Sequence, residues 1–192
     1  MVRSISSSPA VRKTTRAVLP GLIVVLFAFT ISVPRALAQN DVGAVRRAYV
    51  YNLTKYVSWP QSKHTLLIGV VGDTGTGVAM KAMLDGKSSD GRIIHVVLNP
   101  PDSGLSACDL VYVASTETSA SSHIFALVNV LPILTVGEDS RFLTHGGMVG
   151  LVRSADRIEI EVNLKSVRTA GLKMSSRLLD LATVVSNKET LK

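Results

Sequence analysis

Two glycine-rich segments come closest to catalytic or ligand-binding motifs. His145-Gly146-Gly147 is similar to the oxyanion segment of some lipases, but an acyl hydrolase also needs an activated serine on a Gly-x-Ser-x-Gly turn, which this sequence lacks. The segment 72–77 (GDTGTG) stands after an apolar run and before a helical pattern, where a phosphate-binding turn would stand. It matches neither GxGxxG nor a P-loop. We therefore predict an ordinary turn at each place, and retain Asp73 as a candidate ligand-binding residue.

The residue types that bind metals are scattered along the chain. No His-x3-His, Cys-x2-Cys or calcium-loop pattern occurs, so the sequence predicts no metal and no cofactor. Asp109, Glu159 and Glu161 are interpreted as residues that flank strands or face solvent, not as a catalytic pair. The histidines stand at four separate places: His64, His95, His123 and His145.

Cys108 is the single cysteine, so an internal disulfide is impossible. It stands before Asp109 and the apolar run 110–113, a setting typical of a buried structural thiol. A disulfide link between two chains is the alternative.

Aromatic side chains suited to binding are concentrated in the segment 49–59, which contains the only tryptophan. Tyr and Trp are frequent at interaction hot spots, although a lone Trp in a small domain is also commonly packed in the core. Trp59 therefore has two interpretations, structural and binding. Tyr51 and Lys55 are the better surface candidates, because they lie off the apolar stripe of the helix expected there.

A helix over 42–58 must position these aromatic residues. Apolar side chains recur there at spacings of three and four, which defines one face of an amphipathic helix. Pro60 disfavours helical geometry in the residue before it, so the helix is expected to end at Trp59. The predicted apolar stripe consists of Val42, Val45, Tyr49, Leu53 and Tyr56.

Residues 66–136 alternate between short apolar runs and helical patterns. This interleaving predicts βαβ units and a mostly parallel sheet flanked by helices, hence an α/β fold. In such sheets ligands bind at the carboxyl ends of strands, where Asp73, Ser115 and Gly137 are expected. The expected strands are 66–72, 93–98, 110–114 and 133–136, and the expected helices are 76–85 and 117–130.

The last third of the sequence predicts a C-terminal β-hairpin, whose two strands are the apolar runs 148–152 and 157–162. The second run alternates strictly between polar and apolar residues, which indicates a strand exposed on one face and near an edge of the sheet.

Two terminal helices complete the predicted single domain. Asn163 is positioned to cap a helix over 164–170, and Gly171 to end it in the left-handed conformation. Ser175 or Ser176 is expected to cap the final helix. Its predicted apolar face consists of Leu178, Leu179, Ala182 and Val185.

Residues 1–38 have the three-part pattern of a secretory signal peptide. A basic lead-in precedes an apolar run over 18–33 and the triplet Ala36-Leu37-Ala38, so cleavage is expected after Ala38. An uncleaved anchor is the alternative, but the run contains Pro20 and is shorter than the ~20 residues that span a bilayer. The expected domains are a signal peptide over 1–38 and an α/β domain over 39–192.

The formal net charge of +7 belongs mostly to this leader. Residues 1–38 carry five of the 21 basic residues and none of the 14 acidic ones, which leaves about +2 for residues 39–192. A nucleic-acid-binding domain needs Lys and Arg concentrated on one face. The sequence therefore argues against a nucleic-acid partner and, after cleavage, against direct membrane insertion.

Seven short blocks follow one another from about residue 44 to 185: YVSWP (56–60), IGVVGD (68–73), GR (91–92), CDLVY (108–112), LTVG (134–137), GGM (146–148) and the segment from Asn163 through Gly171 to SSRLL (175–179). Together they resemble the YfiR family. The resemblance implies a non-enzymatic periplasmic α/β protein, often dimeric, that inhibits an inner-membrane diguanylate cyclase by binding its periplasmic part. It would thereby control cyclic-di-GMP signalling and biofilm formation. Some members have disulfides, for which Cys108 has no partner within this chain.

The resemblance implies a partner or dimer surface, which we place on exposed residues of the first helix, the hairpin and the segment 171–176. Lys55 and Lys173 are candidates for contacting an acidic patch or a small anionic ligand, because each adjoins one of the blocks and is expected to reach solvent. Two other classes stay open: a periplasmic small-molecule sensor that feeds a membrane sensor kinase, and an envelope hydrolase. The complete predicted site is Tyr51, Lys55, Trp59, Asp73, Lys173 and Ser175.

Overall fold

A computed structural model describes residues 41–61, 63–114 and 118–185. The expected signal peptide and its cleavage after Ala38 lie outside these ranges. Within them, no helix is both long enough and apolar enough to cross a membrane.

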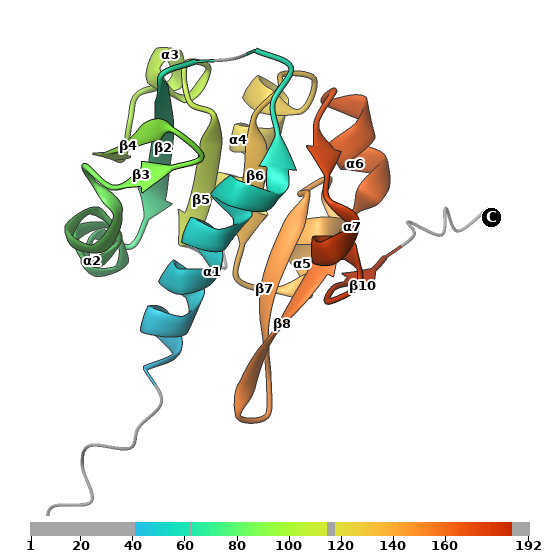
Figure 1. The fold of residues 1–192 in the computed structure, drawn as a ribbon. Helices are drawn as coiled ribbons and strands as arrows, with labels where there is room; N and C mark the ends of the chain where they lie inside the picture. Colours follow the sequence, from blue (N-terminus) through green and yellow to red (C-terminus); the bar gives the residue numbers. More distant parts are fainter. Residues whose placement is uncertain (1–40, 62, 115–117, 186–192) are drawn as a thin grey trace, which may run out of the picture. The chain divides into compact units, whose positions relative to one another are not determined.

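The described residues form an α/β fold, as the sequence predicted (Figure 1). One eight-stranded sheet has the order β10-β8-β7-β6-β5-β2-β4-β3, and β1 pairs separately with β9. The elements are α1 (Val42–Tyr56), β1 (Val57–Ser58), β2 (Thr65–Gly72), α2 (Thr74–Leu84), β3 (Ser88–Ser89), β4 (Arg92–Leu98), α3 (Asp102–Leu105), β5 (Leu110–Ala114), α4 (Thr118–Val128), β6 (Leu134–Gly137), α5 (Ser140–Thr144), β7 (Val149–Ser154), β8 (Arg157–Val162), α6 (Leu164–Thr169), β9 (Lys173–Met174), α7 (Ser176–Leu179) and β10 (Thr183–Val184).

The strands β4-β2-β5-β6-β7 are parallel neighbours in a doubly wound order. β7 and β8 form the predicted hairpin. β10 lies outside β8, so the second hairpin strand is next to the edge of the sheet, as expected.

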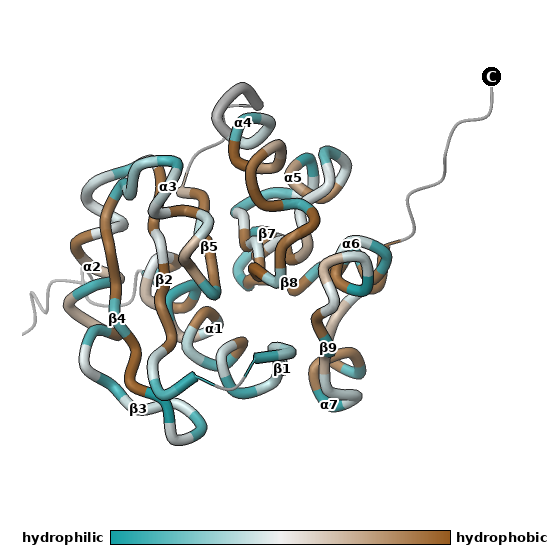
Figure 2. Tube along the Cα trace, turned by 90° about the horizontal axis from the view of Figure 1, so that it is seen from above, coloured by the Kyte–Doolittle hydropathy of each residue, from teal (hydrophilic) through white to brown (hydrophobic). Residues whose placement is uncertain are grey.

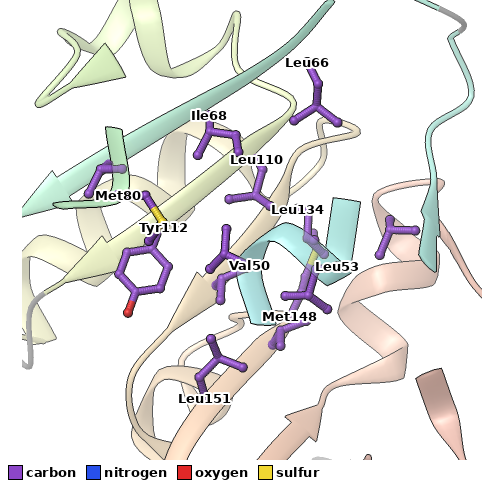
Figure 3. Close-up of a cluster of buried hydrophobic side chains, with 14 of the residues drawn as sticks. Val50, Leu53, Leu66, Ile68, Met80, Leu110, Tyr112, Leu134, Met148 and Leu151 are labelled. Carbon is purple, nitrogen blue, oxygen red and sulfur yellow. The ribbon is translucent and has the colours of Figure 1, made fainter. Parts of the chain in front are cut away.

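The central strands are buried on both faces of the sheet. Every residue of β5 is buried, and this strand is strongly hydrophobic in Figure 2. Helices α1, α2, α6 and α7 pack on one face, and α3, α4 and α5 on the other. Figure 3 shows Val50 and Leu53 of α1 among Leu110 and Leu134 of the sheet. Burial on both faces explains the continuous apolar runs in the sequence.

Two helices give way to short strands that the sequence did not predict. α1 ends at Tyr56, not Trp59, because residues 57–58 pair with β9. α7 ends at Leu179, because Thr183 and Val184 join the sheet as β10, so the predicted long final helix was wrong. Strands of two residues have no detectable periodicity, so the sequence pattern does not predict them.

The buried face of α1 also differs from the predicted stripe. Val50, Leu53 and Thr54 are buried, whereas the stripe residues Val45 and Tyr56 are 39% and 37% exposed. A polar residue is tolerated on the buried face because the Thr54 hydroxyl is hydrogen-bonded to the Ser89 hydroxyl at 2.6 Å.

The predicted caps of the C-terminal helices are confirmed. Asn163 Oδ1 accepts the Ser166 N–H at 3.1 Å at the start of α6, and Gly171 follows this helix with φ of +72°. Ser175 Oγ accepts the Leu178 N–H at 3.3 Å at the start of α7. Local side-chain chemistry therefore sets where these helices begin.

The segment His145-Gly146-Gly147 is a turn between α5 and β7, as predicted. Gly146 has φ of +106°. A Cβ on Gly147 would overlap the Phe142 ring and lie 2.7 Å from the Phe142 main-chain oxygen. These glycines therefore serve packing and chain reversal.

Replacing Gly147 by Ala is expected to lower the free energy of unfolding by about 2 kcal/mol or more, because the added methyl group collides with buried Phe142. Urea titration followed by circular dichroism measures the change. Gly86→Ala is the control: it has φ of +76° but open space around its Cβ, so its cost should be smaller. The reverse order of costs would contradict the packing role.

Candidate functional site

Two neighbouring cavities lie at the amino ends of the central strands. The larger, about 360 Å³, lies between the C-terminal end of α1 and the turn before β4, and we call it the basic groove. The smaller, about 230 Å³, reaches Cys108. Trp59 and Lys63 line both. The basic groove is lined by Lys55, residues 57–61, Lys63, His64 and residues 90–92.

Trp59 is the fixed wall between the two cavities. Its indole Nε1–H donates to the Asp109 main-chain oxygen at 2.8 Å. The Arg92 guanidinium lies 4.7 Å from the centroid of the ring, a cation–π contact, and Arg92 Nη2 also donates to the Thr54 oxygen at 3.1 Å. Trp59 is half-buried and packs against the core, as its structural interpretation requires. It also lines both surface cavities, so it is placed where a partner could contact it.

The Asp109 side chain holds Lys63, a residue of the groove lining, in place. Its Oδ1 accepts from Lys63 Nζ at 2.8 Å, and its Oδ2 accepts the Leu67 N–H at 2.8 Å. Its side chain is only 7% exposed. Asp109 balances the positive charge of Lys63. Of the other charged residues in the lining, Lys55 and Arg92 outweigh Asp90, so the groove has a net positive charge. Asp109 stands at a strand end as predicted, but its anchoring role has no signature in the sequence.

Tyr51 and Lys55 lie side by side at the end of α1. Lys55 is exposed, and its Nζ lies 4.2 Å from the centroid of the half-buried Tyr51 ring. The Tyr51 hydroxyl donates to the Ser88 main-chain oxygen at 3.0 Å. The aromatic ring therefore supports the ammonium group at the rim of the groove.

The β1–β9 pair brings the C-terminal segment to the same place. Ser58, which lines the groove, is paired with Lys173, and the Ser175 N–H donates to the Tyr56 oxygen at 2.9 Å. Figure 2 shows β1 beside β9 near α1. The structure thus brings five of the six predicted site residues together: Tyr51, Lys55, Trp59, Lys173 and Ser175.

Asp73 lies apart from the other predicted site residues, after the carboxyl end of β2. It caps α2 by accepting the Thr76 N–H at 2.6 Å, and this main-chain hydrogen bond lowers the pKa of its carboxyl group. Gly137 ends β6, and Ser115 lies outside the described residues. Among those residues, no three His, Cys, Asp or Glu side chains gather as a metal site.

Cys108 is a buried thiol, as predicted, and 3% exposed. Its Sγ–H donates to the Gly104 oxygen at 3.3 Å. Burial, followed by the negative charge of Asp109, raises the thiol pKa to about 11. The smaller cavity therefore ends at an unreactive group.

A network missed in the sequence holds the N-terminal half of α1 on the sheet. Arg46 Nη1 lies 2.7 Å from Glu138 Oε2, and Arg46 also donates to the main-chain oxygens of Glu138 and Leu151. Glu138 Oε1 accepts from the buried Tyr112 hydroxyl at 2.7 Å. Burial and the Glu138 charge raise the pKa of Tyr112. Helical periodicity assigns Arg46 to the polar side and gives no sign of these long-range partners.

Comparison with known proteins shows the family. Residues 43–183 match the YfiR/HmsC-like family model, and the chain belongs to that family. At family level, this supports a periplasmic regulator of cyclic-di-GMP signalling and does not identify the partner. The crystal structure of a conserved domain protein from Vibrio cholerae O1 biovar eltor matches with a TM-score of 0.50 and 13% identity over 73% of this chain. This chain spans 60% of that protein's length, and the likeness shows the fold alone.

At pH 8, Cys108 is expected to react with iodoacetamide at least about 100-fold more slowly than an exposed cysteine, because the thiolate is the reactive form and the raised pKa makes it scarce. Mass spectrometry of the native protein measures the rate. The matched control is the double variant C108S/S103C, which moves the thiol to an exposed position of helix α3. Equal rates in the two proteins would contradict burial of Cys108.

Asp109→Ala is expected to lower the free energy of unfolding by roughly 3 kcal/mol, because the Leu67 N–H and the Lys63 ammonium lose their acceptor. The emission of Trp59, the only tryptophan, should stay unchanged, because its indole donates to the Asp109 main-chain oxygen, which the substitution keeps. Asp102→Ala removes an exposed carboxylate paired with His123 and should change neither quantity appreciably. An unchanged free energy of unfolding in Asp109→Ala would contradict the anchoring role of this carboxylate.

Proposed function

We propose that this chain is an exported regulatory protein, cleaved after Ala38, that binds the periplasmic domain of an inner-membrane diguanylate cyclase and inhibits it. It would thereby control cyclic-di-GMP signalling and biofilm formation. Family membership supports the regulatory class. The observation that carries the choice of surface is that Lys55 and Trp59 line one groove and that Lys173 is paired with Ser58 of the same lining.

The groove has the features of a protein-binding hot spot. Trp59 is held by Asp109 and Arg92, so little side-chain entropy would be lost when a partner packs against it. Lys55, Arg92 and Lys173 supply positive charge around this aromatic anchor. An acidic patch on the receptor is the complementary surface.

Binding suits this groove better than catalysis does. The polar contacts of Trp59, Arg92 and Asp109 run to main-chain groups or to neighbouring side chains. Such contacts hold side chains in place and give a rigid docking surface.

A periplasmic small-molecule sensor is the second candidate, and the size of the groove favours it. Its volume of about 360 Å³ falls within the range of ligand pockets. A small anion would lie between Lys55 and Arg92 against Trp59, and its occupancy would be passed to a membrane sensor kinase.

Charge reversal of both Lys55 and Lys173 to Glu is expected to weaken capture of the receptor's periplasmic domain by roughly tenfold or more, because two attractive contacts become repulsive. Both side chains are exposed, so the melting temperature should stay unchanged. Quantitative pull-down with the purified receptor domain measures the effect. R141E/K165E is the matched control, since it makes the same charge change on exposed residues of α5 and α6 outside the groove.

Unchanged capture by K55E/K173E would remove these residues from the site. An equal loss in R141E/K165E would show a general charge effect. Capture that depends on an added small anion, together with a change of Trp59 emission on that anion alone, would favour the sensor.

A further inference from the structure

The basic residues of this chain fall into two groups. Among the 14 Lys and Arg residues that the structure describes, six are ion-paired with a carboxylate: Arg46, Arg47, Lys63, Lys81, Arg141 and Arg157. Another, Arg153, donates to the Ala155 main-chain oxygen on the β7–β8 hairpin. The other seven form no ion pair with any described carboxylate. Their charges therefore stay available to a partner outside the described chain.

These seven residues lie on neighbouring elements, and we call them the basic band. β1 pairs with β9 beside the end of α1, and the Tyr51 hydroxyl joins α1 to Ser88 of β3. Helices α6 and α7 directly precede and follow β9. Figure 2 shows β3, β1, β9 and α7 along one side of the fold. The basic band consists of Lys55 on α1, Lys87 and Arg92 on either side of the β3 turn, Lys165 and Arg168 on α6, Lys173 on β9 and Arg177 on α7.

The charge of the described residues is strongly polarised. Every residue of the basic band is exposed except Arg92, which is half-buried. Two described carboxylates stand near band residues in the sequence, Asp90 and Asp180. Counted with them, the band has an excess of five positive charges, whereas the rest of the described residues carry seven basic and ten acidic side chains. The small net charge of the domain thus hides one strongly basic side.

The arrangement of the cations indicates what kind of partner they fit. Lys55 and Lys87 lie 4.2 Å and 5.7 Å from the centroid of the same Tyr51 ring, measured from Nζ, so two ammonium groups are gathered at one point. Of the whole band, only Lys55 and Arg92 line the basic groove. The others stand on α6, β9, α7 and beside β3, so a ligand confined to the groove would leave them without a partner. A broad surface of negative charge can contact all of them.

We propose that the basic band holds the processed protein against a membrane that contains anionic phospholipids, through the phosphates of the headgroups. Lipids move laterally, so headgroups can gather opposite fixed cations, and each Lys or Arg near the surface adds a small attraction. The contact is electrostatic and reversible and needs no insertion into the bilayer. This association does not rest on the proposed function, since it requires neither a receptor nor a small anion.

Co-sedimentation with vesicles tests the basic band. Residues 39–192 are used, because the leader is itself basic and apolar. The protein should bind vesicles of phosphatidylcholine and phosphatidylglycerol mixed two to one, and not vesicles of phosphatidylcholine alone. R168E/R177E should lower the partition coefficient by about tenfold or more, because two attractions become repulsions. R141E/R153E makes the same change of net charge on exposed residues outside the band and should lower it by less than about threefold, since screening weakens distant charges.

The same variants separate this proposal from the proposed receptor. Arg168 and Arg177 do not line the basic groove, so R168E/R177E should still capture the receptor's periplasmic domain while it loses the vesicles. Circular dichroism checks that both double variants are folded. Absence of binding to the mixed vesicles overturns the proposal, as do equal losses in the two double variants. Binding to a DNA duplex without binding to vesicles also overturns it, in favour of a nucleic-acid surface.

Discussion

The buried carboxylate of Asp109 is the constraint on which the basic groove depends. It stands directly before β5, whose residues are all buried, so the core sets its position. From there it accepts from Leu67 and Lys63, while its main-chain oxygen accepts the Trp59 indole. Leaving this carboxylate without partners would be costly. The sheet and the groove therefore form together, and a rearrangement of Lys63 must provide a new partner for the Asp109 carboxylate.

Helix α1 joins this groove to the opposite part of the sheet. Its N-terminal half is held by Arg46, which contacts Glu138 and Leu151, and its C-terminal end carries Lys55. Packing of its middle turns in the core makes it one rigid element. The contact that places Lys173 beside the groove is much smaller, a ladder of two residue pairs. A regulator needs two states of different partner affinity, and a ladder of two residue pairs costs less to open than the packed middle of α1.

The fold was largely predictable because burial on both faces leaves apolar runs such as 110–114, and because caps such as Asn163 are local. The part of the site on and just after α1 was also predictable, because Lys55 and Trp59 are close together in the sequence. The rest depends on contacts that periodicity does not report. Arg92 reaches the Trp59 ring through the pairing of β4 with β2, and Asp109 reaches it through the pairing of β5 with β2. Strand register decides both contacts, and no local pattern specifies that register across so many residues.

The position of the groove follows from the element that precedes the parallel core. Doubly wound sheets usually bind ligands at the carboxyl ends of the strands, where the order reverses, here between β2 and β5. At that point the Asp73 N–H donates to the Ala114 oxygen, and the Asp73 side chain caps α2. The basic groove instead lies at the amino ends, because α1 crosses the sheet before β2 and must deliver the chain to the start of that strand. The crossing places Lys55 and Trp59 beside the first residues of β4, so the surface proposed for partner binding is built from elements added to the parallel core.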